Sequence, residues 1–138
     1  MARGSYDWQP WTSVQRFAGT GGATPYELKA TVAKDVAEGA ATSTAFTLAK
    51  GFISKVWLRF PSGPAGLLHI AFYNEATRLW PGIETQWFTG DNEVIEFETE
   101  LDVPLVTTDY KVTIKGWNED DSFEHSVLAR IWVVSLPA

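Results

Sequence analysis

The residues with the clearest potential for chemistry lie in the acidic segment 117–125, which reads Trp-Asn-Glu-Asp-Asp-Ser-Phe-Glu-His. Hard cations such as Ca²⁺ take several oxygen ligands. Glu119, Asp120 and Asp121 are therefore candidate ligands, with Asp91 as a fourth if its loop lies nearby. The spacing lacks the alternating acidic positions, central glycine and distal glutamate of an EF-hand loop. A solvated loop whose Asn and Asp side chains form turns explains the same segment, and we favour it over a metal site.

Other groups suited to catalysis are few. The chain has two histidines, His69 and His125, and no cysteine, which leaves too few imidazole and thiolate groups for a zinc site. No serine lies in a Gly-x-Ser-x-Gly elbow. Glu96, Glu98 and Glu100 share one strand face and could pair for glycoside hydrolysis, but we expect that face to meet solvent or a partner rather than line a cleft. We therefore expect neither an enzyme nor a cofactor.

The glutamate row has two further interpretations. It can keep an exposed sheet face soluble, or it can pair with a basic row on another copy of the chain. Lys55, Trp57 and Arg59 alternate along one strand and offer such a basic row. The acidic residues are concentrated after residue 82 and the basic ones before it, which suits a contact between oppositely charged surfaces.

Seven tryptophans are many for a chain of 138 residues. Some of them could form a flat platform for sugar rings, as in carbohydrate-binding modules on β-sandwiches. Alternatively they fill the core or a subunit interface, which is the interpretation that we favour. The residues in question are Trp57, Trp80, Trp87 and Trp117.

The first 24 residues differ from the rest of the chain. Aromatic residues occur there at irregular spacing, and a Gly-rich stretch at 19–25 follows with the composition of a flexible linker. We predict an N-terminal arm and hinge at residues 1–24 that either binds a partner or folds back over its own domain. The candidate contact residues of the arm are Tyr6, Trp8, Trp11 and Phe17.

Composition narrows the classes of partner. The formal net charge of −6 argues against a nucleic acid, whose binding proteins carry a basic surface. The N-terminal residues lack the apolar core of a signal peptide, and no apolar stretch is long enough to span a membrane. Without disulfides, stability must come from packing or from oligomerisation.

Residues 25–138 are predicted to form one all-β domain. Segments 52–60 and 68–73 alternate apolar and polar residues on either side of a Pro-Gly stretch, which predicts a hairpin with a long loop. The last strand is apolar on both faces, which favours a central place in a sheet. The predicted strands are 26–32, 44–48, 52–60, 68–73, 78–80, 93–101, 110–115 and 125–136.

The connections between these strands favour one topology. Residues 34–43 are expected to form a loop, with a short helix at 32–41 as the alternative, and residues 116–124 a polar loop. About eight strands with loops of unequal length fit a Greek-key jelly roll better than an up-and-down barrel. We therefore predict an antiparallel eight-stranded jelly-roll sandwich with an N-terminal arm.

Three segments, 55–67, 90–97 and 117–121, resemble small jelly-roll proteins encoded among the structural genes of tailed bacteriophages. Such proteins decorate the capsid shell or sit at the neck and tail, often as trimers. The resemblance covers residues 26–136 and carries over no functional residue. It implies a virion protein, assembled in the host cytoplasm, whose partners are a capsid, neck or tail protein and further copies of itself.

The sequence thus predicts a structural decoration or accessory subunit of a tailed-phage virion. It would bind capsid or neighbouring subunits through aromatic contacts and its arm, and form a homo-oligomer such as a trimer, with no nucleic acid and no membrane as partner. The alternative function is a carbohydrate-binding β-sandwich module that uses exposed tryptophans.

Overall fold

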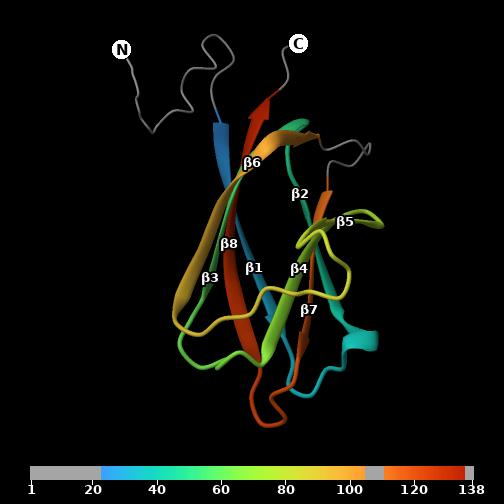
Figure 1. Ribbon diagram of the computed structural model, residues 1–138, viewed down its shortest axis with the longest axis vertical. Helices are drawn as coiled ribbons and strands as arrows, with labels where there is room; N and C mark the ends of the chain where they lie inside the picture. The colour runs from blue at the N-terminus through green and yellow to red at the C-terminus, as the bar shows by residue number, and fades with distance from the viewer. Residues whose placement is uncertain (1–22, 105–110, 136–138) are drawn as a thin grey trace.

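The computed structural model describes residues 23–104 and 111–135, and its strands form two four-stranded antiparallel sheets packed face to face (Figure 1). The first sheet has the order β1-β8-β3-β6 and the second β2-β7-β4-β5. Eight strands in this order form a jelly roll, so the predicted fold is confirmed. The strands are β1 (Ala23–Val32), β2 (Thr42–Thr47), β3 (Gly51–Phe60), β4 (Leu68–Asn74), β5 (Thr77–Trp80), β6 (Glu93–Pro104), β7 (Lys111–Asn118) and β8 (His125–Ser135).

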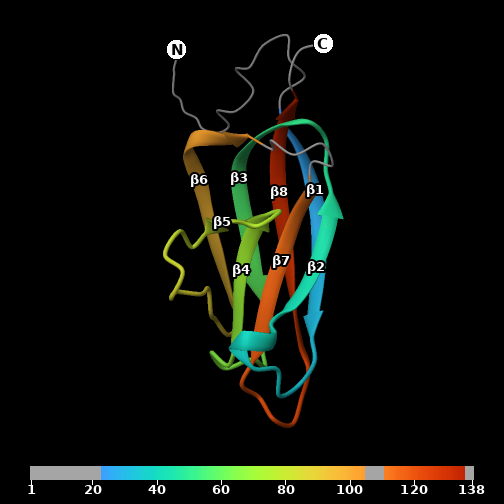
Figure 2. The ribbon, with the colours of Figure 1, turned by 90° about the vertical axis from the view of Figure 1, so that its right-hand side faces the viewer.

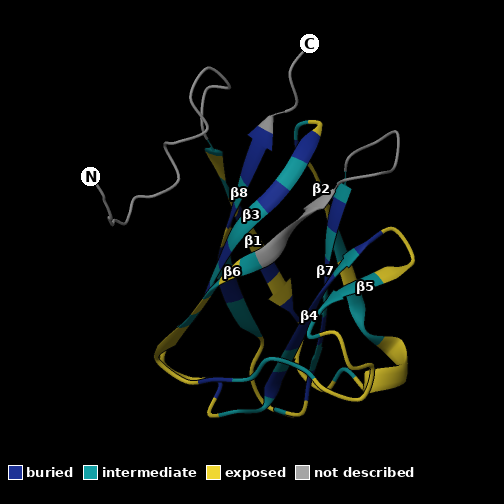
Figure 3. Cartoon of the chain, turned by 45° about the horizontal axis from the view of Figure 1, so that its top comes forward, coloured by how far each residue is buried: buried dark blue, intermediate teal, exposed yellow. Residues whose placement is uncertain are grey.

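The core lies between the two sheets and follows from the alternation of side chains along each strand. On β3, Val56, Leu58 and Phe60 are fully buried, and Leu68, Ile70 and Phe72 of β4 face them from the second sheet. Buried segments run through the middle of both sheets in Figure 3. Strand β8 pairs with β1 on one side and β3 on the other, which confirms its predicted central position.

Strand β1 begins earlier than predicted. Ala23 and Thr24 pair with Val134 and Val133, so two residues assigned to the hinge belong to the first sheet. The strand pairing satisfies their backbone groups, which outweighs the flexible composition of the stretch that precedes them. The rest of the predicted arm and hinge, residues 1–22, lies outside the described residues.

The predicted hairpin at residues 52–73 is wrong. Strand β3 pairs with β8 and β6, whereas β4 pairs with β7 and β5, so the two strands lie in opposite sheets. The Pro-Gly stretch between them crosses the sandwich, with Ala65 and Gly66 at positive φ. Apolar and polar residues alternate in the same way in two strands that face each other across a core and in two strands paired in one sheet. The alternation alone therefore does not show whether two such strands are paired.

Strand β7 also extends further than predicted, through Asn118 rather than ending at residue 115. Gly116 points into the core, where an added Cβ would lie 2.7 Å from Val32 Cγ2 and 2.9 Å from Ile70 Cδ1. A glycine here allows close packing of the two sheets, whereas the sequence analysis treated it as the start of a loop.

The connection between β1 and β2 is a loop, as predicted, with one short 3₁₀ turn at Glu38–Ala40 in place of the alternative helix. Val36 of this loop forms an isolated β-bridge with Asn118, the last residue of β7. After β5 the chain swings out beside β4 before returning to it (Figure 2), and Phe88 pairs with Ile70. No helix in the described residues is long and apolar enough to cross a membrane.

Candidate functional site

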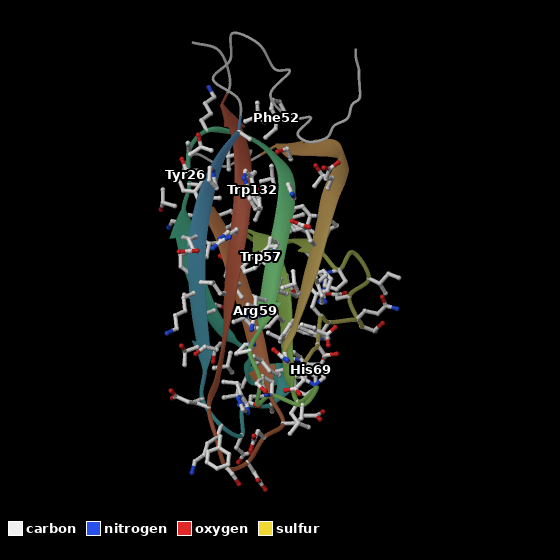
Figure 4. The ribbon with its side chains drawn as sticks, turned by 90° about the vertical axis from the view of Figure 1, so that its left-hand side faces the viewer. Tyr26, Phe52, Trp57, Arg59, His69 and Trp132 are labelled. Carbon is white, nitrogen blue, oxygen red and sulfur yellow. The ribbon has the colours of Figure 1, made fainter. Side chains whose placement is uncertain are left out.

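The outer face of the first sheet carries a row of large side chains. Figure 4 looks onto this face, with Trp132 of β8 and then Trp57 and Arg59 of β3 following one another along the sheet. Both tryptophans are half-buried, and Val94 on the edge strand β6 is 42% exposed. This face is therefore solvent-facing in the described chain yet rich in apolar surface.

A cation lies against each tryptophan of this face. The Arg130 guanidinium is 4.6 Å from the centre of the Trp57 ring, and the Lys55 ammonium is 5.1 Å from that of Trp132. Arg130 also donates to Glu27 at 2.9 Å. Cation–π contacts and ion pairs of this kind limit the positions that the rings adopt. The face thus presents two indole rings, each in contact with a cation.

A hollow lies at each end of this row. The hollow near Arg59 has a volume of about 390 Å³, and the one near Trp132 about 310 Å³. The first is lined by Lys29, Arg59, Pro61, Ser126, Val127 and Leu128. The second is lined by Pro25, Tyr26, Glu27, Arg130 and Trp132. An otherwise regular sheet face thus offers two recesses separated by the Trp57–Arg130 pair.

Glu96 and Glu98 of the glutamate row lie on the same outer face as the basic row of β3. Trp57 is opposite Glu96 and Lys55 opposite Glu98 in the strand register. Lys55 forms an ion pair with Glu96 at 3.1 Å. The two rows therefore meet within one chain, and the predicted pairing with another copy is not needed to explain their charges.

The outer face of the second sheet has its own aromatic cluster. The rings of His69 and Trp117, which are opposite each other on β4 and β7, stack 3.7 Å apart at an angle of 6°. Trp87 meets Trp117 edge-on at 6.1 Å. Within the described residues His69 Nε2 and Trp117 Nε1 are buried without a hydrogen-bond partner. Burial lowers the pKa of His69, while the charges of Glu119 and Glu38 oppose this effect.

Arg78 fastens the loop after β5 onto this face. Its Nε donates to the carbonyl of Pro81 at 2.8 Å, and its Nη1 to the carbonyl of Glu84 at 3.0 Å. Nη1 also reaches the Tyr73 hydroxyl at 3.2 Å, and Nη2 donates to the carbonyl of Gln86. One side chain thereby satisfies three loop carbonyls and shapes a strand-to-loop corner.

This corner encloses a pocket of about 280 Å³, referred to here as the Tyr73–Trp87 pocket. The Lys115 ammonium lies 4.5 Å from the Tyr73 ring centre, and the Arg78 guanidinium 4.7 Å from that of Trp87. Trp87 Nε1 donates to Glu38 at 3.1 Å. The lining residues are Glu38, Gly39, Ala41, Tyr73, Arg78, Glu84, Trp87 and Lys115.

The four candidate tryptophans do not form one platform. Trp57 lies on the outer face of the first sheet, whereas Trp87 and Trp117 meet on that of the second. Trp80 packs against the core, edge-on to Phe72 at 6.0 Å and to Phe97 at 5.5 Å. The sandwich itself separates these residues, so a sugar platform built from all four is wrong.

The acidic candidates act as caps of loop backbone. Asp120 Oδ1 accepts hydrogen bonds from the backbone N–H groups of Ser122 and Phe123, and its Oδ2 lies 2.8 Å from His125 Nε2. The bond with His125, followed by the bond from Ser122, lowers the pKa of Asp120. The carboxylate therefore orders the β7–β8 loop.

Asp91 plays the same part at the β3–β4 loop. Its Oδ1 accepts from the backbone N–H groups of Gly63 at 2.8 Å and Ala65 at 3.0 Å, and these bonds lower its pKa. Glu119 lies 3.6 Å from His69, and Asp121 accepts from Ser122. Across residues 23–104 and 111–135, no group of three or more His, Asp or Glu side chains is placed to hold a metal ion.

Some residues of these surfaces were missed by the sequence analysis. Nothing in the sequence was a reason to select them beyond their places in predicted strands; they are Tyr73, Arg78, Lys115, Arg130 and Trp132. Only their neighbours across the sheet reveal the pocket and the paired cations. The arm candidates Tyr6, Trp8, Trp11 and Phe17 lie outside the described residues.

No family model matches the chain, and no curated protein matches it. Among solved structures, the chain is similar to a protein of Bacillus endospore appendages, described as a novel family of disulfide-linked pili. The TM-score is 0.38 and the sequence identity 13%, over 86% of this chain and 96% of the other. The function proposed for this chain therefore does not rest on these comparisons.

Proposed function

We propose that the chain is a structural subunit of a tailed-phage virion, a decoration or accessory protein that binds neighbouring protein subunits. The observation that carries the proposal is the outer face of the first sheet. There Trp57 and Trp132, each held by a cation, lie between two hollows on a surface that faces solvent. The proposal includes no catalytic role.

The composition of this face favours a protein partner. Interface cores are enriched in tryptophan and arginine, and alanine substitution of these residues usually costs the most binding energy. Trp57, Trp132 and Arg130 form such a centre, and charged residues of both signs surround it. The hollows on either side suit protruding side chains of a partner, because recesses of this kind fix the register of two surfaces.

The N-terminal segment supports the same role. Residues 1–22 continue from Ala23, the first residue of β1, which belongs to the sheet that carries the proposed interface. A single partner could therefore engage both the face and the arm. Two weak contacts joined in one chain bind far more tightly than either alone, and many copies on one particle multiply the effect.

The experiment compares incorporation of variants into phage particles. The variant Trp57→Ala/Trp132→Ala removes both indole rings, and Trp87→Ala removes one from the opposite sheet as a matched control. We expect the double variant to fold, shown by its thermal melting, but to be incorporated at least about tenfold less than wild type. The control should be incorporated normally. Full incorporation of a folded double variant would overturn this role for the face.

A further inference from the structure

The Tyr73–Trp87 pocket lies on the second sheet, away from the interface proposed on the first. Tyr73 and Trp87 contribute half-buried aromatic rings, and Glu38, Glu84 and Lys115 bring charged groups to the same space. The lining is mainly polar, with Tyr73 and Trp87 as its aromatic part, so the pocket suits a polar ligand rather than an apolar one.

The donors and acceptors of the pocket differ in how far they are already used. The N–H groups of Arg78 donate to loop carbonyls and to the Tyr73 hydroxyl, so this side chain stabilises the walls of the pocket. Lys115 lies over the Tyr73 ring and forms no ion pair with any residue of the described chain. Glu38 accepts from Trp87 through Oε2, which leaves Oε1 for a ligand donor. The pocket thus offers one ammonium and two carboxylates.

This mixture of charges selects the chemistry of the ligand. An anion would meet the carboxylates of Glu38 and Glu84, and a cation would meet the positive charges of Lys115 and Arg78, so neither is favoured. A sugar hydroxyl both accepts and donates, so adjacent hydroxyls can accept from Lys115 and donate to Glu38. The C–H groups of a sugar ring would pack against the part of the Trp87 ring that the Arg78 guanidinium leaves open.

The size of the pocket limits the length of the ligand. Its volume of about 280 Å³ lies just below the range of typical small-molecule sites, which runs from about 300 to 1,000 Å³. The space suits one ring and not an extended chain. We propose that the Tyr73–Trp87 pocket binds a single neutral sugar ring, as the end of a glycan.

The test measures binding of defined sugars to the full-length chain by saturation-transfer NMR and tryptophan fluorescence. The probes are the methyl glycosides of glucose, galactose, mannose and N-acetylglucosamine, with methyl glucuronide as an anionic comparison. We expect at least one neutral probe to bind with a Kd of about 1 mM, and methyl glucuronide to bind more weakly. Absence of binding by every neutral probe up to about 50 mM would overturn the proposal, as would preference for the glucuronide.

Variants test whether the sugar binds in the Tyr73–Trp87 pocket. Trp87→Ala should weaken the best neutral probe by at least about tenfold, since it removes the aromatic wall. Glu38→Gln and Lys115→Met alter partly or fully exposed side chains, so they test the same site if Trp87→Ala does not fold. Trp57→Ala on the opposite sheet is the control and should bind like wild type. Loss of binding in Trp57→Ala alone would move the sugar to the other face and refute the pocket.

The outcome is independent of the virion proposal. Particle incorporation depends on Trp57 and Trp132, whereas sugar binding depends on Trp87, Glu38 and Lys115. A folded Trp87→Ala variant that enters particles but loses sugar binding would support both proposals, and each can fail without the other.

Discussion

His69 shows how one buried ring makes stability depend on pH. Its imidazole is stacked against Trp117, and burial lowers its pKa below the ordinary value of 6.5. Above that value the ring is neutral in both the folded and the unfolded chain. As the pH falls below it, the unfolded chain takes up the proton first, so the folded state loses stability.

We therefore predict that the melting temperature falls when the pH is lowered from about 7.5 to about 5.5, and that His69→Phe reduces this fall. Phenylalanine keeps an aromatic ring against Trp117 but does not titrate. Asp91 and Asp120 do not contribute to this fall in melting temperature. Their pKa values are lowered in the folded chain, so the stability that they add is lost only as the pH falls below their ordinary pKa of 3.8. Equal slopes for wild type and variant would show that His69 is not the group responsible.

The side chain of Asn118 joins two loops, the β1–β2 loop and the β7–β8 loop. It is 1% exposed, its Nδ2 donates to the carbonyls of Ala33 and Phe123, and its Oδ1 accepts from the N–H of Asp120. We predict that Asn118→Ala lowers the free energy of unfolding by about 2–4 kcal/mol, because it leaves three backbone groups without partners. Urea denaturation measures this change. The control Ser43→Ala, at an exposed strand position, should stay within about 0.5 kcal/mol of wild type.

At the scale of the elements, alternation predicted the strands and their buried faces but not which strands pair. The alternation along segment 52–60 indicated one apolar face, and Val56, Leu58 and Phe60 on that face are buried. The partners of β3 were wrong because pairing depends on residues more than thirty positions away on β6 and β8. The Tyr73–Trp87 pocket was not predicted for the same reason, since it joins residues of three strands and two loops that lie apart in the sequence.

The first residue of strand β3, Gly51, has no room for a side chain. A Cβ at Gly51 would lie 2.2 Å from the carbonyl oxygen of Val134 and 2.9 Å from Val133 Cγ1. We predict that Gly51→Ala destabilises the protein by about 3 kcal/mol or more, because β3 cannot keep its pairing with β8. Gly39→Ala is the matched control, since no atom lies within 4 Å of its added Cβ. Similar urea midpoints for the two variants would contradict this account of β3.

At the scale of the whole molecule, the sandwich and the arm are predicted to have separate tasks. Deleting residues 1–22 leaves every described strand intact, so the melting temperature should change little. If the arm anchors the protein, incorporation into particles should be lost. Unchanged incorporation would remove the arm from the proposed function.

The mass of the full-length protein in solution is the first measurement to make, by light scattering after size exclusion. We predict a stable homo-oligomer such as a trimer, with the outer face of the first sheet as its interface. The variant Trp57→Ala/Trp132→Ala should then shift the mass towards the monomer. A monomeric wild type would contradict the predicted homo-oligomer. The outer face of the first sheet would then contact other subunits only on the assembled particle.

The pairing of Ala23 with Val134 gives the molecule a polarity. The described chain enters and leaves the sandwich at one end, while the β3–β4 and β7–β8 loops lie at the other (Figure 1). A copy held at Ala23 would keep those loops about 30 Å from that residue, the length of a ten-residue strand. Phe123, 69% exposed in the β7–β8 loop, would then face outward. A foreign peptide inserted at that position would project into solvent, away from the anchored end of the sandwich. It would have the same orientation on every copy.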